Sequence, residues 1–311
     1  PEELRNQLYQ DLSNLKILGR VYVAQEGINA QISIPDHKWD GFKDYTNASS
    51  ILKGIKLKKA VQEGLSFLKL TIKVKEEIVA YNLPKDAYDM NKVGKHLSAK
   101  EFNASIDQND AIVIDIRNYY ESEVGKFEGA ITPDVDRSKE LLPEVAKLLA
   151  DKKDKKLHLY CTGGIRCEKA SSYLLKQGFK EVYQLDGGIV QYAHDIKKEN
   201  LPSKFIGKNF VFDNRLGEKV TDHVIGKCHQ CRQKADSHTN CANDACHILF
   251  IQCDDCKTTY NGCCSEDCKD FAQLDIQTQK ELRKDVTKTV SSSKLSSKIK
   301  PKLYKLFNYW K

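Results

Sequence analysis

The first part of the chain alternates apolar and polar residues in the manner of strands, with helical periodicity on either side. LGRVYVA (18–24) and INAQISI (28–34) have a period of two, and the QEGI turn between them holds Gly27, whose backbone freedom suits a hairpin. The pattern predicts a helix over 1–14, these two strands, a helix near 36–48 and a long alternating strand over 66–79. This order is typical of a ferredoxin-like (acylphosphatase-like) α+β unit, βαββαβ, without its first strand.

From Ser98 onward, short apolar runs alternate with helical segments. Ser98 and Glu101 form a capping box for a short helix, and AIVID (111–115) is the continuous apolar run of a buried parallel strand. The elements expected next are a helix over 140–150, a strand over 157–160, a helix over 167–177, a strand over 181–185 and a last helix after Gly188. This alternation predicts an α/β domain with a parallel sheet and helices on both faces. Ligands of such sheets bind at the carboxyl ends of strands, where Asp115 and Cys161 both lie.

At 311 residues the chain is too long for one ordinary core, and we expect several domains. The boundaries expected are a ferredoxin-like domain over 1–90, the α/β domain over 96–200, a cysteine-rich segment over 201–270 and a basic tail over 271–311. No apolar run approaches the roughly 20 residues that span a bilayer, and no signal peptide opens the chain. We therefore expect a cytoplasmic protein without membrane contact. Because the chain begins at Pro1 rather than at a methionine, we also expect that it is trimmed at its start.

The net charge of +7 is concentrated at one end of the chain. Between Lys280 and Lys311 ten Lys and Arg stand against two acids, so this end carries +8 and the remainder is close to neutral. Aromatic residues are interleaved with these lysines, namely Tyr304, Phe307, Tyr309 and Trp310. Such a composition can neutralise phosphates and stack on bases, which indicates contact with a nucleic acid. A solvated terminus is the simpler interpretation.

The loop CTGGIR (161–166) places a cysteine between a strand and a helix. Amide hydrogens of the residues that follow Cys161 can converge on its sulfur, and the helix N-terminus adds partial positive charge. Gly163 and Gly164 permit the backbone angles that such a nest of amides needs, and Arg166 adds a full charge. Each effect favours the thiolate over the thiol, so Cys161 is predicted to be a catalytic nucleophile assisted by Arg166.

The length of this loop separates two kinds of enzyme. Phosphatases of the tyrosine type have five residues between cysteine and arginine, whereas four stand here, Thr162, Gly163, Gly164 and Ile165. A loop of four suits a sulfur-sized substituent, although a buried structural cysteine beside a glycine turn is the plainer alternative.

Two further groups of residues near this loop have open roles. Asp115 and Arg117, at the end of a strand, are candidate catalytic residues or else ordinary polar strand ends. Cys167 is expected to be a small packing residue of the first helical turn, with a resolving disulfide as the alternative.

Nine of the eleven cysteines crowd into residues 228–268. Without an export signal, this density favours metal over disulfides. The spacing allows eight of them to close two four-cysteine zinc sites of a structural kind, but it does not say which cysteines share an ion. The predicted ligands are Cys228, Cys231, Cys241, Cys246, Cys253, Cys256, Cys264 and Cys268, with Cys263 left over. His229, His238 or His247 could replace a sulfur, and an iron–sulfur cluster or reduced free thiols are the alternatives.

Several blocks of the sequence resemble known families. VIDIRNYYESEVGKFEGAI, YCTGGIRCEKA and LDGGI together resemble a rhodanese domain, with Lys126 and Phe127 standing where a histidine and an aliphatic residue are usual. With VYVAQEGINAQISIP before them and KNFVFDNRLGEKVTDHVIGKCHQC, DSHTNCAND and FIQCDDC after them, almost the entire chain is similar to the bacterial tRNA uridine hydroxylases. These proteins have a central rhodanese domain and hydroxylate carbon-5 of the wobble uridine.

This resemblance implies an oxygen-dependent tRNA modification that requires Cys161 and acts on the anticodon region. Molecular oxygen as co-substrate is what the resemblance implies, and the chain has no flavin or nicotinamide motif. One hypothesis is that the Cys161 thiolate, or its persulfide, adds to carbon-6 of uracil and makes carbon-5 electron-rich. The alternatives are a sulfurtransferase that carries sulfur from a donor as a Cys161 persulfide, and a non-catalytic RNA-binding adaptor.

Overall fold

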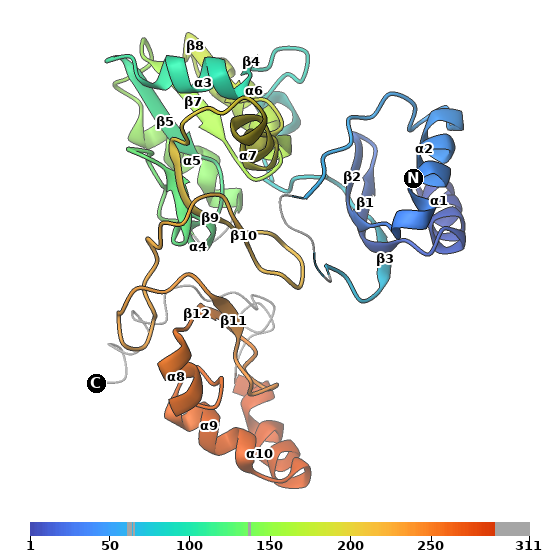
Figure 1. Cartoon of the computed structure of the whole chain (residues 1–311), viewed down its shortest axis with the longest axis vertical. Coiled ribbons are helices and arrows are strands. Elements are labelled where there is room, and N and C mark those ends of the chain that lie inside the picture. Colours follow the sequence, from blue (N-terminus) through green and yellow to red (C-terminus); the bar gives the residue numbers. More distant parts are fainter. Residues whose placement is uncertain (61–63, 65, 136–137, 290–311) are drawn as a thin grey trace.

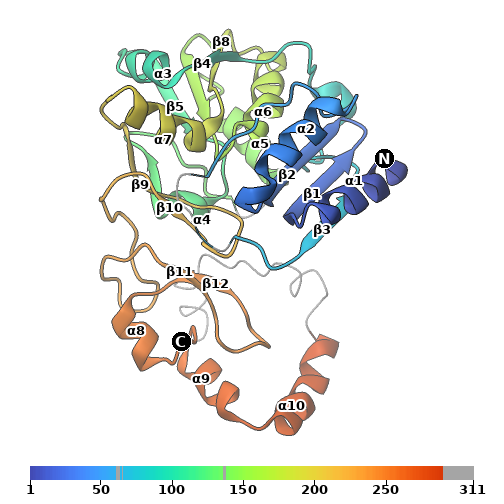
Figure 2. The same ribbon diagram turned by 45° about the vertical axis from the view of Figure 1, so that its right-hand side comes forward.

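The computed structural model describes residues 1–60, 64, 66–135 and 138–289 of the chain. Figure 1 shows three parts: an N-terminal α+β unit, a central α/β domain beside it, and a C-terminal segment below the central domain. Figure 2 shows the same arrangement after rotation, with the N-terminal unit in front of the central domain. The aromatic part of the basic tail falls in residues 290–311, so the prediction of nucleic-acid contact there lies outside the described residues. No helix in the described part of the chain has the length and apolar character that a membrane span needs.

The N-terminal unit has the predicted order of helix, strand, strand, helix, strand. Its elements are α1 (Glu2–Asn14), β1 (Leu18–Ala24), β2 (Gly27–Ser33), the 3-10 turn η1 (Asp36–Lys38), α2 (Trp39–Ala48) and β3 (Leu70–Val74). The sheet order is β2-β1-β3, with β1 antiparallel to β2 and parallel to β3. Leu8 and Leu12 of α1 and Phe42 of α2 pack on the apolar face of β1, which explains the period of two in its sequence.

The strand predicted over 66–79 is shorter than expected. Its pairing with β1 is confined to residues 70–74, and the last bond of the ladder runs from Lys75 N to Val23 O. Since β1 ends at Ala24, the later residues have no strand to pair with. Ile78 N donates instead to the carboxylate of Glu26 in the hairpin turn, at 2.5 Å.

The central domain is built on a parallel sheet, as predicted. Its strands β4 (Lys95–Leu97), β5 (Ala111–Asp115), β7 (Lys156–Tyr160) and β8 (Glu181–Leu185) lie in the order β4-β8-β7-β5. Its helices are α3 (Ala99–Ile106), α4 (Tyr119–Ser122), α5 (Ser138–Leu148), α6 (Ile165–Lys176) and α7 (Gly188–Lys198). The capping box of Ser98 and Glu101 opens α3 as expected. The 3-10 turn η2 (Lys85–Ala87) precedes this domain in the chain.

Two apolar clusters cover the two faces of this sheet. One joins Leu157 and Leu159 of β7 to residues of α5 and α6, and the other joins Tyr160 to residues of α3 and α7. Neighbouring residues of β7 thus point to opposite faces, which buries the strand completely and accounts for its continuous apolar run. β7 ends at Tyr160, and Cys161, the next residue, is still buried in the cluster that contains Leu157 and Leu159.

The C-terminal segment begins within the central domain. β9 (Phe205–Asn209) pairs with β6 (Gly125–Phe127) and with β10 (Glu218–Lys219), so this segment is joined to the α/β domain by main-chain hydrogen bonds. Beyond it lie the hairpin β11 (His238–Asn240) and β12 (Leu249–Ile251) and the helices α8 (Asp254–Thr259), α9 (Glu266–Gln273) and α10 (Ile276–Thr289). The cysteine-rich residues occupy the loops and helix starts of this last part.

Candidate active site and candidate metal centres

The Cys161 loop connects the carboxyl end of β7 to the N-terminus of α6. Gly164 is the residue that precedes α6, and its φ of +88° is a left-handed conformation that favours glycine. This conformation turns Gly164 N toward the sulfur of Cys161, at 3.1 Å. Cys161 itself is fully buried. The strand, the glycine and the helix start therefore place the Cys161 sulfur beside the amide of Gly164.

The environment of Cys161 stabilises its thiolate. Burial alone would raise the pKa of Cys161, but the Cys167 thiol, the Arg166 charge and the amides of both residues lower it to about 6. The stabilising groups all belong to the first turn of α6, so they are positioned by the helix. At neutral pH Cys161 is mostly thiolate, the form that acts as a nucleophile.

Arg166 is held beside the loop by Glu121, a residue that the sequence analysis did not select. Glu121 accepts two hydrogen bonds from the guanidinium of Arg166, at 2.6 and 2.8 Å, and one from Thr162 Oγ1 at 3.2 Å. Burial would raise the pKa of Glu121, but the neighbouring Arg166 lowers it below its usual value. Glu121 is the glutamate of the rhodanese-like segment ESEVG (121–125), and that resemblance was the available signal for it.

We expect Glu121→Gln to destabilise the protein by about 3 kcal/mol, because it leaves the charge of Arg166 without its buried partner. Thermal unfolding measures this effect. The matched control is Glu128→Gln, the same change at an exposed carboxylate of the same segment, which should shift stability by less than about 0.5 kcal/mol. Equal melting of the two variants would mean that the Glu121–Arg166 pair does not hold the loop.

Asp115 and Arg117 form a buried ion pair behind the loop. Arg117 Nη2 donates to Asp115 Oδ2 at 2.6 Å and to Gly125 O at 2.7 Å. Tyr160 Oη donates to the same carboxylate at 2.8 Å. Because Tyr160 directly precedes Cys161, the pair anchors the strand end that carries the nucleophile. The hydrogen bonds described for the Asp115 and Arg117 side chains join them to each other, to Arg117 N, to Tyr160 and to Gly125 O. None of these bonds reaches the Cys161 loop.

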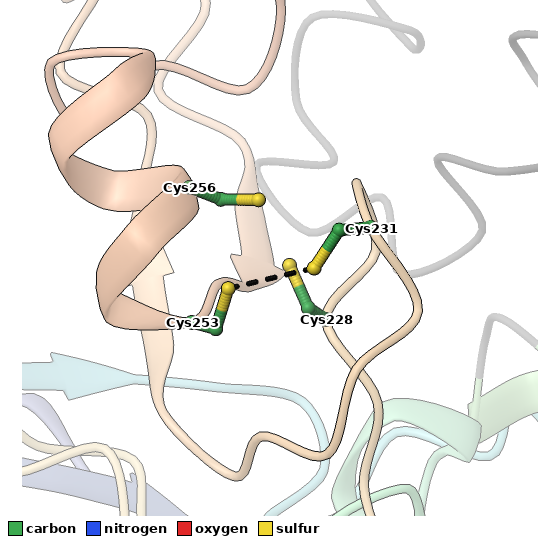
Figure 3. Close-up of side chains that lie close together, drawn as sticks. All are labelled: Cys228, Cys231, Cys253 and Cys256. Carbon is green, nitrogen blue, oxygen red and sulfur yellow. Dashed lines mark hydrogen bonds between the residues drawn. The ribbon is translucent and has the colours of Figure 1, made fainter.

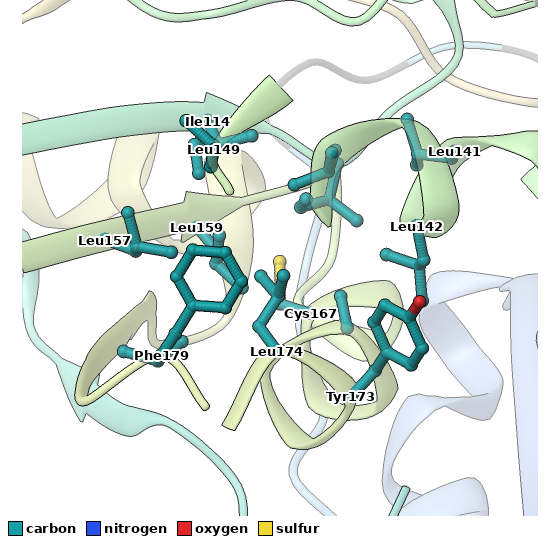
Figure 4. Packing of buried hydrophobic residues seen from close by; sticks show 14 of the residues in the cluster. Ile114, Leu141, Leu142, Leu149, Leu157, Leu159, Cys167, Tyr173, Leu174 and Phe179 are labelled. Atoms are coloured by element: carbon teal, nitrogen blue, oxygen red, sulfur yellow. The ribbon is translucent and has the colours of Figure 1, made fainter. Parts of the chain in front are cut away.

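Cys167 lies in the apolar cluster between β7 and α6 (Figure 4). It is fully buried, as expected of a first-turn packing residue. Burial raises its pKa far above the ordinary value, and the hydrogen bond with Cys161 raises it further. Cys167 therefore remains a thiol that donates to the Cys161 thiolate, which is a role that the sequence analysis did not foresee.

The eight cysteines selected from the sequence come together as two groups of four. The first cysteine group is Cys228, Cys231, Cys253 and Cys256, and the second cysteine group is Cys241, Cys246, Cys264 and Cys268. Figure 3 shows the sulfurs of the first group turned toward a shared space between a loop and the start of α8. Neither group contains Cys263 or a histidine.

The sulfur positions fit a tetrahedral metal ion. Four thiolates about 2.3 Å from zinc stand about 3.8 Å from one another. The sulfur–sulfur distances are 3.5 Å for Cys231–Cys253, 3.7 Å for Cys246–Cys264 and 3.6 Å for Cys264–Cys268. Within each group all four sulfurs lie within 4.8 Å of one another. Both cysteine groups could therefore hold a metal ion with four sulfur ligands.

Three family models match successive parts of the chain. The UPF0176 acylphosphatase like domain matches residues 1–78, the rhodanese-like domain matches 98–195, and the family described as Rhodanase C-terminal matches 206–269. The first two matches confirm the fold class that the sequence predicted for the N-terminal unit and the central domain.

Curated relatives match over most of the chain. A protein of Leptospira interrogans named tRNA uridine(34) hydroxylase is 50% identical over 283 residues, which cover 91% of this chain and 77% of the relative. A protein of Photorhabdus laumondii with the same name is 47% identical over 285 residues, covering 91% and 81%. Among solved structures, a rhodanese-like domain from Anabaena sp. matches with a TM-score of 0.29 and 16% identity, covering 36% of this chain and 78% of that one.

Proposed function

The chain belongs to the tRNA uridine(34) hydroxylase family, and we propose that it hydroxylates the wobble uridine of tRNA with Cys161 as the nucleophile. The observation that carries the assignment to Cys161 is its place between β7 and α6, where Gly164 N donates to its sulfur at 3.1 Å and Cys167 and Arg166 lower its pKa to about 6. A thiolate at neutral pH is the reagent that adds to an electron-poor double bond. The uracil ring presents such a bond between carbon-5 and carbon-6.

In the proposed reaction the Cys161 sulfur forms a bond to carbon-6 of the uracil. The electron pair of the double bond then becomes available at carbon-5, where the bond to oxygen forms. Loss of the proton from carbon-5 restores the double bond and expels the Cys161 thiolate. Molecular oxygen is proposed as the co-substrate: one of its atoms becomes the hydroxyl on carbon-5 and the other leaves as water. The two electrons and two protons that this requires are proposed to come from two molecules of a thiol reductant, which are oxidised to a disulfide.

The residues around Cys161 have separate roles in this proposal. Arg166, fixed by Glu121, supplies a positive charge beside the sulfur, and residues 162–165 shape the loop that receives the base. Cys167 donates a hydrogen bond to the thiolate when it leaves. Asp115 and Arg117 are proposed as positioning residues, since their pair holds Tyr160 next to the nucleophile.

We propose zinc as the metal of both cysteine groups, since all eight ligands are sulfur and the two groups are closed. A closed site of four thiolates leaves no open position for a substrate, so zinc would stabilise the fold of the C-terminal segment. The anticodon region of tRNA is the proposed partner, and a cytoplasmic location follows from that substrate. A sulfur donor is required only if Cys161 acts as a persulfide.

The pH dependence of the reaction tests the role of the thiolate. We expect kcat/KM for hydroxylation to fall about tenfold per pH unit below a pH of about 6, and to level off above it, because protonation removes the nucleophile. The rate should be measured with purified protein and tRNA between acidic and neutral pH. An acid limb centred near the ordinary cysteine pKa of about 8.5 would contradict the lowered value.

Mass spectrometry of tRNA nucleosides tests the function itself. A strain without this gene should lack 5-hydroxyuridine derivatives from this route, and the wild-type gene should restore them when oxygen is present. If hydroxylation does not depend on the gene and the purified protein transfers sulfur from thiosulfate to cyanide, the sulfurtransferase alternative is correct.

A further inference from the structure

A lysine-rich segment of the N-terminal unit crosses the edge of the Cys161 loop. We call residues 56–59 the lysine strap, since they comprise Lys56, Lys58 and Lys59 around one leucine. The ammonium of Lys58 donates to Gly163 O at 2.6 Å, and the carbonyl of Lys59 pairs with His194 Nε2 of α7 at 3.0 Å. In Figure 1 the chain runs from α2 toward α7 in this region. The strap is thus attached both to the loop and to the helix beside it.

A cavity of 320 Å³ lies between the lysine strap and the loop. Its lining includes Lys56, Lys58, His96, Gly163, Glu168 and Asp186. The volume is at the lower end of the roughly 300–1,000 Å³ of ligand pockets, which suits a single nucleotide unit rather than a duplex. The stem of Lys58 lies close to Gly187, because a Cβ built on Gly187 would meet Lys58 Cε at 3.4 Å. Lys58 therefore lies across two glycine-containing loops, one of which carries Cys161.

The first turn of α7 is already used within the protein. Ile189 N donates to Cys161 O at 3.0 Å, and Val190 N donates to Thr162 O at 3.1 Å. These two bonds hold the loop in place, so those amides are not available to a ligand. The amides of Ile189 and Val190 therefore offer no positive charge to a ligand in the cavity.

The charged side chains that line the cavity differ in how well each is paired with an opposite charge. His96 is paired with Glu168 at 2.7 Å, and Lys56 stands 3.5 Å from Asp186 with both side chains well exposed, which makes a weak pair. The ammonium of Lys58 donates to the carbonyl of Gly163, and in the part of the chain that the structure describes it forms no ion pair. An ammonium has three N–H donors, so two remain for a ligand. Lys58 is thus a cation of the cavity without a paired carboxylate, and it is bonded to Gly163, two residues after Cys161.

We propose that Lys56 and Lys58 bind backbone phosphates of the RNA strand next to the uridine that Cys161 modifies. Phosphates are the ligand that this chemistry favours, since an exposed, mobile ammonium binds them as a point charge. The contact between Lys58 and Gly163 places such a phosphate beside the loop and so sets the position of the adjoining nucleotide. This inference rests on the proposed function for the identity of the strand, and it assigns to the N-terminal unit a direct part in the active site.

Binding of an anticodon stem-loop RNA, measured separately from hydroxylation, tests the proposal. The variant is the pair Lys56→Gln and Lys58→Gln, and the probe is a labelled stem-loop with uridine at the wobble position. Two lost contacts to single-stranded RNA should make the dependence of log K on log salt shallower by about 1.4 and raise Kd about tenfold at low salt. In turnover, KM should rise and kcat should stay within about twofold. The pair Lys56→Arg and Lys58→Arg keeps both charges and should retain the salt dependence.

The matched control is Lys155→Gln, the same change at an exposed lysine before β7, at the end of that strand opposite to Cys161. It should leave Kd and the salt dependence as in the wild type. Wild-type binding by the double glutamine variant would overturn the proposal, whatever its activity. If the wild type binds the RNA through these lysines but does not hydroxylate it, the proposed function fails and the phosphate site stands.

Discussion

Replacement of Cys161 by serine should lower hydroxylation by about 10³-fold or more. Serine has nearly the same size, and its hydroxyl can accept the same hydrogen bond from Gly164 N, so the loop should keep its shape. A hydroxyl, however, is not ionised by neighbours that lower a thiol pKa only to about 6. The variant therefore removes the nucleophile and little else. Nucleoside mass spectrometry of tRNA, from a deletion strain that carries either gene and from reactions with purified protein, measures the loss.

Cys167→Ser is the matched control for this experiment. It makes the same substitution in the same turn, and the serine hydroxyl can still donate to the Cys161 thiolate. We expect hydroxylation to stay within about tenfold of the wild type, together with a higher pKa of Cys161. If Cys161→Ser hydroxylates tRNA as well as the wild type does, Cys161 is not the nucleophile, and the adaptor interpretation becomes the better one. A loss in Cys167→Ser as large as in Cys161→Ser would assign Cys167 a chemical role, such as a resolving thiol.

Loss of one metal ligand should unfold the cysteine-rich part of the C-terminal segment. Four-thiolate zinc sites contribute about 10–16 kcal/mol of binding free energy in small folds, which is more than such a segment can replace with its own core. Cys256→Ser removes one sulfur of the first cysteine group, beside α8. We expect two metal ions per chain in the wild type and one in this variant. Elemental analysis measures the metal content, and limited proteolysis reports the unfolding.

Cys263→Ser is the matched control, because Cys263 is a buried cysteine of the same segment that belongs to neither group. It should keep both ions and the proteolysis pattern of the wild type. An absorption spectrum with charge-transfer bands in the visible region would indicate an iron–sulfur cluster instead, since zinc is colourless. Wild-type protein that contains no metal and resists proteolysis would show that the cysteines act as reduced thiols.

The elements that local sequence predicts well are those whose signal lies within a few neighbouring residues. The capping box of Ser98, the buried strand 111–115 and the loop around Cys161 were all predicted, because each depends on local propensity or on the period of apolar residues. The strand predicted over 66–79 was too long because the local pattern does not show where the pairing with a neighbouring strand ends. Its sequence continues to alternate, but a strand also needs a partner, and the length of β1 limits the pairing to 70–74.

The sequence by itself therefore determined the kinds of residues available to this protein: a cysteine in an amide-rich loop, an arginine beside it and eight thiols with metal-ligand spacing. The tertiary structure alone decided which of them meet. Glu121 reaches Arg166 across 45 residues of chain, Lys58 reaches Gly163 across 105, and the cysteines divide between two groups that their order in the chain does not reveal. The physical reason is that such contacts depend on how the sheets and helices pack together, and packing is a property of the whole fold rather than of neighbouring residues.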